Sequence, residues 1–238
     1  MTERRDENAP TILLLGASRG LGAAMAGEFA QRGWHIIGTV RGADRTKLHE
    51  LAELHAGRIA IEQVDVTKRD QIAALRERLS GRQVEMLFVN AGTANRDKPN
   101  ATMADISPDE FADIMITNAL GVMCAVELLQ DLVRPDGLIG AMSSGQGSIA
   151  NNANGVNDLY RSSKAALNQL MKSYAARHAG DQRSLVLMAP GWIRTDLGGP
   201  SAPFGMAEAI PEVVTVLLAQ QGTPGLRFVD RAGKTVPW

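Results

Sequence analysis

The chain has 238 residues, of which 45% are hydrophobic and 21% charged, a composition typical of an ordinary globular domain. Its 25 basic and 26 acidic residues give a net charge of −1, so it lacks the basic surplus of a nucleic-acid-binding protein. A single cysteine excludes an internal disulfide, and the four histidines show no ligand spacing that would support a metal site. The polar start and the lack of an apolar run of about 20 residues predict a cytoplasmic protein that does not enter a membrane.

Apolar runs alternate with segments of helical period along the whole chain. Strands are expected at 11–15, 34–40, 58–66, 84–89, 138–142, 185–188 and 226–229, and helices at 22–31, 44–55, 67–80, 107–132, 158–178 and 207–220. This alternation predicts an α/β chain with a doubly wound parallel sheet of about seven strands flanked by helices, a Rossmann fold. We expect one domain at 11–238, after a polar N-terminal extension at 1–10.

The first predicted strand runs directly into a glycine-rich turn that opens a helix. The turn reads Gly16-Ala17-Ser18-Arg19-Gly20-Leu21-Gly22. Glycines at such a turn let the backbone approach a pyrophosphate, whose charge then lies at the helix N-terminus. An ordinary strand-to-helix turn is the alternative, but the position in an alternating α/β chain favours dinucleotide binding.

The end of the second predicted strand bears on the choice between the two nicotinamide cofactors. An acidic residue there binds the ribose hydroxyls, whereas an arginine nearby accepts a 2′-phosphate. Arg41 stands at this position, and Arg19 lies in the glycine turn. Asp44, three residues further on, is interpreted as the cap of the next helix. The two arginines favour NADP(H), with NAD(H) the possible alternative.

The second half of the chain carries a candidate catalytic group. Tyr160 and Lys164 have i, i+4 spacing, which places them on one helical face. A nearby ammonium is expected to lower the pKa of the phenol toward neutrality. Ser143 and Ser144, at the end of the fifth predicted strand, are expected beside this helix, where a hydroxyl could polarise a carbonyl. Each pattern taken alone also occurs by chance.

Taken together, these patterns resemble the short-chain dehydrogenase/reductase family over residues 11–238. The family's motifs occur in the family's order, as Gly16–Gly22, Asp65-Val66, Asn90-Ala91-Gly92, Asn118, Ser143-Ser144, Tyr160 with Lys164, and Pro190-Gly191 with Thr195.

The resemblance implies a role for each matching residue. Tyr160 would be the catalytic acid, Lys164 would hold the nicotinamide ribose and lower the tyrosine's pKa, and Ser144 (or alternatively Ser143) would orient the substrate. Asn118 would hold a water in a proton relay. The implied cofactor-binding residues are Gly16, Ser18, Arg19, Gly20, Leu21, Gly22, Arg41, Asp65, Val66, Asn90, Ala91, Gly92, Tyr160, Lys164, Pro190, Gly191, Ile193 and Thr195, and no metal is implied.

Two features depart from the commonest family pattern. Leu15 replaces the threonine that usually precedes the first motif glycine, so a hydrogen bond that braces the turn is lost. Ser144 lies 16 residues before Tyr160, a long spacing. With the C-terminal GKTVPW, this spacing is similar to the carbonyl-reductase branch of the family, which includes sniffer and the C-factor signalling protein. The branch implies NADPH-dependent reduction of a ketone or aldehyde by hydride transfer.

Two other functions remain open. One is an alcohol dehydrogenase that oxidises a hydroxylated metabolite with the same residues. The other is a dinucleotide-binding sensor or signalling protein whose catalysis is incidental. The segment 198–206 is expected to be a substrate loop and a possible lid, with Trp192 near the pocket. The family resemblance also implies a homodimer or homotetramer formed through the helices at 107–132 and 158–178.

Overall fold

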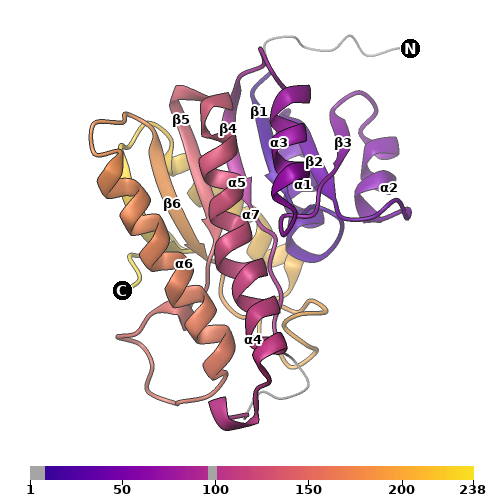
Figure 1. Cartoon of the computed structure of the whole chain (residues 1–238). Coiled ribbons are helices and arrows are strands. Elements are labelled where there is room, and N and C mark those ends of the chain that lie inside the picture. Colours follow the sequence, from indigo (N-terminus) through magenta and orange to yellow (C-terminus); the bar gives the residue numbers. More distant parts are fainter. Residues whose placement is uncertain (1–8, 96–100) are drawn as a thin grey trace.

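The computed structural model describes residues 9–95 and 101–238 (Figure 1). The expected N-terminal extension at 1–10 lies outside this part of the chain except for Ala9 and Pro10. Residues 96–100, in the segment between the fourth predicted strand and the helix that follows it, also lie outside it.

Seven parallel strands form one sheet. They are β1 (Thr11–Leu15), β2 (His35–Val40), β3 (Ile59–Gln63), β4 (Val84–Val89), β5 (Val133–Met142), β6 (Ser184–Ala189) and β7 (Gly225–Asp230). The spatial order is β3-β2-β1-β4-β5-β6-β7, and every neighbouring pair is parallel. The predicted doubly wound fold is confirmed.

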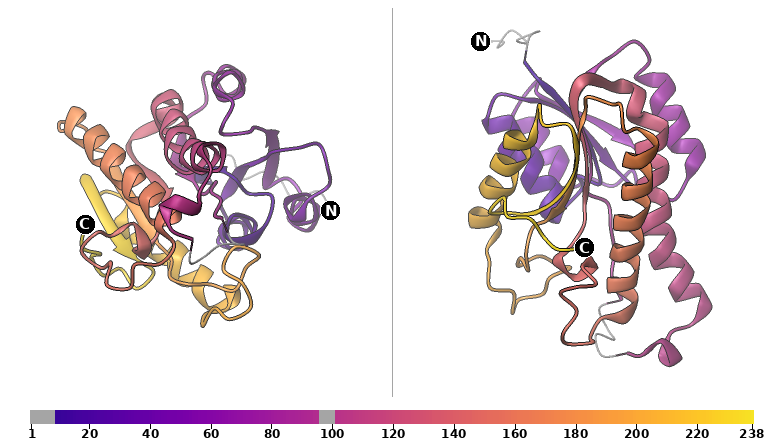
Figure 2. Two further views of the ribbon diagram at one scale, coloured as in Figure 1. Left: turned by 60° about the horizontal axis from the view of Figure 1, so that its bottom comes forward. Right: turned by 90° about the vertical axis from the view of Figure 1, so that its left-hand side faces the viewer.

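Helices cover both faces of the sheet, as the turned views in Figure 2 show. They are α1 (Gly20–Gln31), α2 (Lys47–Leu54), α3 (Arg69–Arg78), α4 (Pro108–Met115), α5 (Gly121–Leu129), α6 (Asp158–Arg177) and α7 (Met206–Gln220). Alternate residues of β1 explain the two layers: Leu13 and Leu15 pack into a core with α3, α5 and α6, whereas Ile12 and Leu14 pack into a core with α1, α2 and α7. A strand buried on both faces needs continuous apolar residues, which is what β1 has.

The functional edge of the sheet follows from this topology. The chain winds outward through β2 and β3 and then returns to β4 on the other side of β1. Ligands of such sheets bind beyond the carboxyl ends of the strands where the winding reverses, here between β1 and β4. These carboxyl ends point to the lower side of Figure 1, where α4 and α6 begin.

The helix that was expected to run unbroken over 107–132 is interrupted. It begins as predicted, since the Glu110 N–H donates to the capping Ser107 hydroxyl at 3.2 Å, but a π-helical turn, Ile116–Leu120, separates α4 from α5. A Cβ at Gly121 would lie 2.7 Å from the Val66 carbonyl oxygen. The chain therefore needs glycine where the helix resumes against the loop that follows β3.

The helical stretch Pro108–Leu132 is also long and apolar enough to cross a membrane by length and composition alone, since a window of 18 residues within it has a mean hydropathy of 1.6. The expectation that no apolar run reaches this length was wrong. Half of this window is buried inside the fold. Ala125, Val126 and Leu129 pack into the core on the face of the sheet that α3, α5 and α6 cover. Packing against the sheet accounts for the apolar character of this segment.

Two predicted boundaries were also wrong. Strand β5 begins at Val133 instead of 138, because Pro135-Asp136-Gly137 forms an irregularity inside the strand opposite β4. Such bulges accommodate proline and glycine in a strand. Helix α2 begins at Lys47, and its cap is Thr46, not Asp44. The Thr46 N–H donates to Nδ1 of His49 at 3.1 Å.

Candidate active site

The glycine turn is built for close backbone approach. Gly16 has φ +83°, and a Cβ there would lie 2.7 Å from the Ala91 backbone nitrogen. The Asn90 side chain donates to the Gly16 carbonyl at 2.9 Å, so the ends of β1 and β4 are tied together. Asn90 therefore braces the glycine turn from the end of β4.

Thr39 supplies a side-chain hydrogen bond that braces the glycine turn, which Leu15 has no polar group to supply. The Gly16 N–H donates to the Thr39 hydroxyl at 3.0 Å, and the Ala17 N–H donates to the Thr39 carbonyl at 2.8 Å. Thr39 lies in β2 and is 1% exposed. Sequence reasoning missed this residue because the contact joins two strands, 23 residues apart in the chain. Its own segment gives no signal, because threonine is common in strands.

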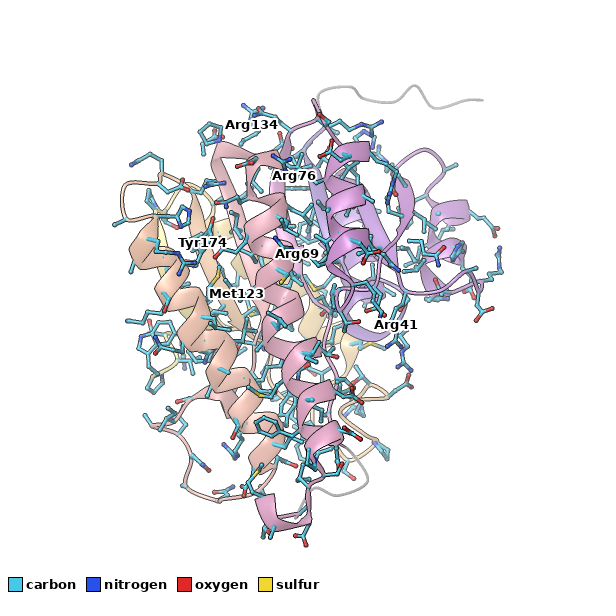
Figure 3. The ribbon with its side chains drawn as sticks, in the orientation of Figure 1. Arg41, Arg69, Arg76, Met123, Arg134 and Tyr174 are labelled. Atoms are coloured by element: carbon cyan, nitrogen blue, oxygen red, sulfur yellow. The ribbon has the colours of Figure 1, made fainter. Side chains whose placement is uncertain are left out.

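The two arginines of the predicted 2′-phosphate site lie at the carboxyl edge. Arg41 follows β2 and extends into solvent (Figure 3), and it makes no ion pair with any residue in the described ranges. Arg19 is ion-paired with Asp196, with 3.0 Å between NH1 and Oδ2. Further along the same edge, the Asp65 carboxylate accepts from the backbone N–H and hydroxyl of Thr67.

The structure brings Ser144, Tyr160 and Lys164 together. The Ser144 hydroxyl lies close enough to the Tyr160 phenol to lower its pKa, and it accepts from the Gln146 N–H at 3.1 Å. The Lys164 ammonium lies 5.9 Å from the centre of the Tyr160 ring and donates to the Met142 carbonyl at 2.9 Å. Lys164 is 2% exposed, so its charge is directed inward at the end of β5.

Ser143, the alternative to Ser144, is occupied elsewhere. It is buried, and its hydroxyl donates to Oδ1 of Asn168 at 2.6 Å. The Asn168 amide in turn donates to the Gly147 carbonyl. Ser143 therefore ties the end of β5 to α6, and of the two serines Ser144 is the one that contacts the phenol.

Asn118 lies buried in the π-helical turn. Its carbonyl accepts from the Thr93 N–H at 2.8 Å, and its amide donates to the Thr93 carbonyl at 2.8 Å and to the Ser163 hydroxyl at 2.9 Å. Ser163 donates to the Tyr160 carbonyl. A Cβ at Gly92 would lie 3.4 Å from both Asn118 Oδ1 and the Lys164 ammonium. Asn118 thus joins the loop after β4 to the helix that carries the tyrosine. π-turns often mark functional sites.

The loop that follows β6 is closed by its own side chains. The Trp192 indole donates to the Gly198 carbonyl at 2.7 Å, the Gly198 N–H donates to the Thr195 hydroxyl at 2.9 Å, and Arg194 donates to two carbonyls at 202 and 203. Pro190 and Ile193 are buried, and Gly191 has φ +90°. The remaining residues expected to bind cofactor, Ser18, Gly20, Leu21 and Val66, lie along the same edge in the glycine turn and after β3.

Burial dominates the electrostatics of the catalytic group. It raises the pKa of Tyr160, and the hydrogen bond from Ser144 opposes this only in part. It also lowers the pKa of Lys164 from 10.5 to about 8. The expectation that the ammonium would lower the phenol's pKa is not met in this structure, because the ammonium is itself desolvated and directed at the Met142 carbonyl. The phenol is therefore protonated at neutral pH.

The low pKa of Lys164 predicts how stability changes with pH. The unfolded chain keeps its lysine proton up to about pH 10.5, whereas the folded chain loses it above about pH 8, so rising pH favours the folded state in this window. Relative to Lys164→Met, the wild type should gain about 1 kcal/mol of unfolding free energy between pH 7 and 9. Urea unfolding of both proteins across this range measures it. A difference that stays flat would contradict the assigned pKa.

Known proteins resemble this chain over most of its length. The family model for short chain dehydrogenase matches residues 10–203. A short-chain dehydrogenase/reductase from Burkholderia multivorans, solved with bound NADP, is 58% identical, with a TM-score of 0.95 and coverage of 97% of this chain and 100% of that one. The carbonyl reductase Sniffer of D. melanogaster is 27% identical, with a TM-score of 0.86 and coverage of 97% and 100%. The C-signal protein of Myxococcus xanthus is 30% identical over 157 residues, which are 65% of this chain and 93% of that protein.

The matched segment contains the glycine turn, the Asn118 turn and the Ser144–Tyr160–Lys164 group, and the solved relatives share the seven-stranded fold. The predicted family, including its carbonyl-reductase branch, is confirmed. This chain belongs to the short-chain dehydrogenase/reductase family of oxidoreductases.

Proposed function

We propose that the protein is an NADP(H)-dependent carbonyl reductase that converts a ketone or an aldehyde to an alcohol. The observation that carries this proposal is the meeting of Ser144, Tyr160 and Lys164 at the carboxyl edge of the sheet. There the Lys164 ammonium lies 5.9 Å from the centre of the Tyr160 ring, and burial raises the pKa of the Tyr160 phenol. A protonated phenol is the form that a general acid needs for reduction.

The carboxyl edge of the sheet fits a dinucleotide. A Cβ at Gly22 would lie 2.1 Å from the Gly16 carbonyl oxygen, so only glycine permits helix α1 to begin this close to the turn. The N–H groups at the start of α1 then face the phosphates. Arg41 lies at the end of β2, where a 2′-phosphate is accepted. The NADP-bound relative supports NADP(H) as the cofactor of this chain.

Each catalytic residue has a defined task in the reduction. When bound, NADPH supplies the hydride that the carbonyl carbon receives. The Ser144 hydroxyl donates to the carbonyl oxygen and polarises it, and Tyr160 gives its phenolic proton to the same oxygen, which completes the alcohol. Lys164 holds the nicotinamide ribose and stabilises the phenolate that remains. Asn118 holds the water through which the proton is restored from solvent.

The proposal has two alternatives. Oxidation of an alcohol uses the same residues in reverse, so the preference for NADP(H), and not the catalytic residues, favours reduction. The likeness to C-signal is the specific observation that favours a signalling role. A sensor that only binds dinucleotide has no need of the Ser144–Tyr160 pair. We also propose that the segment 198–206 is the substrate loop. The helices within 107–132 and 158–178 are proposed as the surface through which copies of the chain pair.

Binding and turnover test the proposal in two steps. In a fluorescence titration, NADPH should bind at least tenfold more tightly than NADH, a difference of about 1.4 kcal/mol. A panel of small ketones and aldehydes should then oxidise NADPH. Equal affinities for the two cofactors, or tighter binding of NADH, would contradict the assignment of Arg19 and Arg41 to the 2′-phosphate. Turnover only with NAD⁺ and alcohols would establish the oxidative alternative instead.

A further inference from the structure

We propose that Asp196 tunes the cofactor specificity of this site by holding Arg19, so that the carboxylate competes with the 2′-phosphate of NADP(H) for the same guanidinium. The proposal rests on the use of NADP(H) by the proposed function but not on which substrate is reduced.

The ion pair between Arg19 and Asp196 crosses the carboxyl edge of the sheet. Arg19 lies in the turn after β1, and Asp196 lies in the loop after β6, 177 residues further along the chain. Two strands, β4 and β5, separate β1 from β6 in the sheet. The contact therefore spans the side of the sheet where the winding reverses, which is where a dinucleotide is bound.

Both ends of this contact are anchored by bonds that do not depend on the pair. Arg19 is the N-cap residue of α1, and its carbonyl accepts from the Ala23 N–H. On the other side, the Gly199 N–H donates to the Thr195 carbonyl and the Gly198 N–H to the Thr195 hydroxyl, each at 2.9 Å. Only the Arg19 side chain has to move for it to change partners, and the Asp196 carboxylate stays close by.

The exchange is energetically easy. The side chains of Arg19 and Asp196 are 67% and 68% exposed, and an ion pair this exposed contributes little. A phosphate dianion makes a stronger, charge-assisted contact with arginine. The carboxylate still opposes the exchange, because it attracts the guanidinium. This competition does not affect NADH, which has no 2′-phosphate.

Arg19 differs from the neighbouring arginines in its ion-pair partner. Arg45 is held by both carboxylate oxygens of Glu53 at 2.8 and 2.7 Å. Arg41, within the part of the chain that the structure describes, has no ion-pair partner. Arg41 is thus available to the phosphate from the start, whereas Arg19 becomes available only as it leaves Asp196.

Replacing the carboxylate isolates its effect. Asp196→Asn should tighten NADPH binding about two- to fivefold in a fluorescence titration, since exposed pairs are worth up to that factor, while NADH binding stays within about 1.5-fold. The gain should shrink at 0.5 M salt because the pair is exposed. Asp136→Asn is the matched control, since Asp136 is 78% exposed and faces Arg134. Arg134 lies near the start of β5, at the end of the sheet opposite the carboxyl edge (Figure 3).

A second variant tests whether Arg19 carries the effect. Arg19→Met should weaken NADPH binding, and adding Asp196→Asn to it should produce no further change. Unchanged or weaker NADPH binding by Asp196→Asn would overturn the proposal, as would an equal gain for NADH or an undiminished gain in the Arg19→Met background. Because these are binding measurements, they stand whether or not the protein reduces carbonyls.

Discussion

Tyr160→Phe is expected to lower kcat/KM for carbonyl reduction about 10²- to 10⁴-fold, the usual contribution of a positioned general acid. The substitution removes one oxygen, which is the source of the proton for the product alcohol and the partner of Ser144. The ring and its place above Lys164 are retained, so the affinity for NADPH should stay within about fivefold. Initial rates at saturating NADPH, together with a binding titration, separate the two effects.

The chain contains a matched control for this variant. Tyr174 is its only other tyrosine and lies on the same helix, α6, far from the carboxyl edge (Figure 3). Its phenol donates to Oε1 of Gln130 at 2.7 Å, and burial raises its pKa to about 12. Tyr174→Phe should keep full activity and lose about 1 kcal/mol of stability, because Gln130 is left without its donor. A Tyr160→Phe enzyme that keeps more than a tenth of the activity would contradict the assigned acid.

The sequence was sufficient to place the main parts of the site on one side of the sheet. Gly16, Asn90 and Ser144 each follow an apolar strand, β1, β4 and β5. Because parallel strands bring their carboxyl ends to a common edge, three short patterns that are distant in the chain had to converge. The i, i+4 spacing of Tyr160 and Lys164 then placed both on one helical face near this edge.

Other parts of the site depend on tertiary contacts that no local pattern encodes. Thr39 braces the glycine turn from β2, although nothing in its own segment distinguishes it from a strand residue with high β-propensity. Ser143 and Ser144 are neighbours of the same type, and only packing shows that Ser143 is bound to Asn168. The π-turn around Asn118 is equally hidden, because its sequence has ordinary helical character.

The electrostatics of the site were the least accessible from the sequence. The spacing of Tyr160 and Lys164 suggested a direct effect of the ammonium on the phenol. The sequence could not show how deeply each group is buried, and burial sets the direction of both pKa shifts.

Gly22→Ala is expected to weaken NADPH binding more than about 100-fold, the effect of moving a binding element by roughly 1 Å. A Cβ at this position would lie 2.1 Å from the Gly16 carbonyl oxygen and 2.7 Å from Nδ2 of Asn90. Because the carbonyl belongs to the backbone, no side-chain rotation relieves the overlap. Helix α1 has to move away from the turn, which separates its first N–H groups from the phosphate position and disrupts the bond between Asn90 and Gly16.

Gly33→Ala provides the comparison, because Gly33 follows the C-terminal end of α1, away from the turn, and has the opposite limitation. Its φ is +85°, but a Cβ there would have no atom within 4 Å. This variant should lose about 1 to 2 kcal/mol of stability from the left-handed backbone while its NADPH affinity stays unchanged. Urea unfolding of both variants measures the backbone strain, and NADPH titration measures the effect of the overlap between the new Cβ and the glycine turn. If Gly22→Ala bound NADPH within threefold of the wild type, the close approach of α1 to the turn would not be what forms the cofactor site.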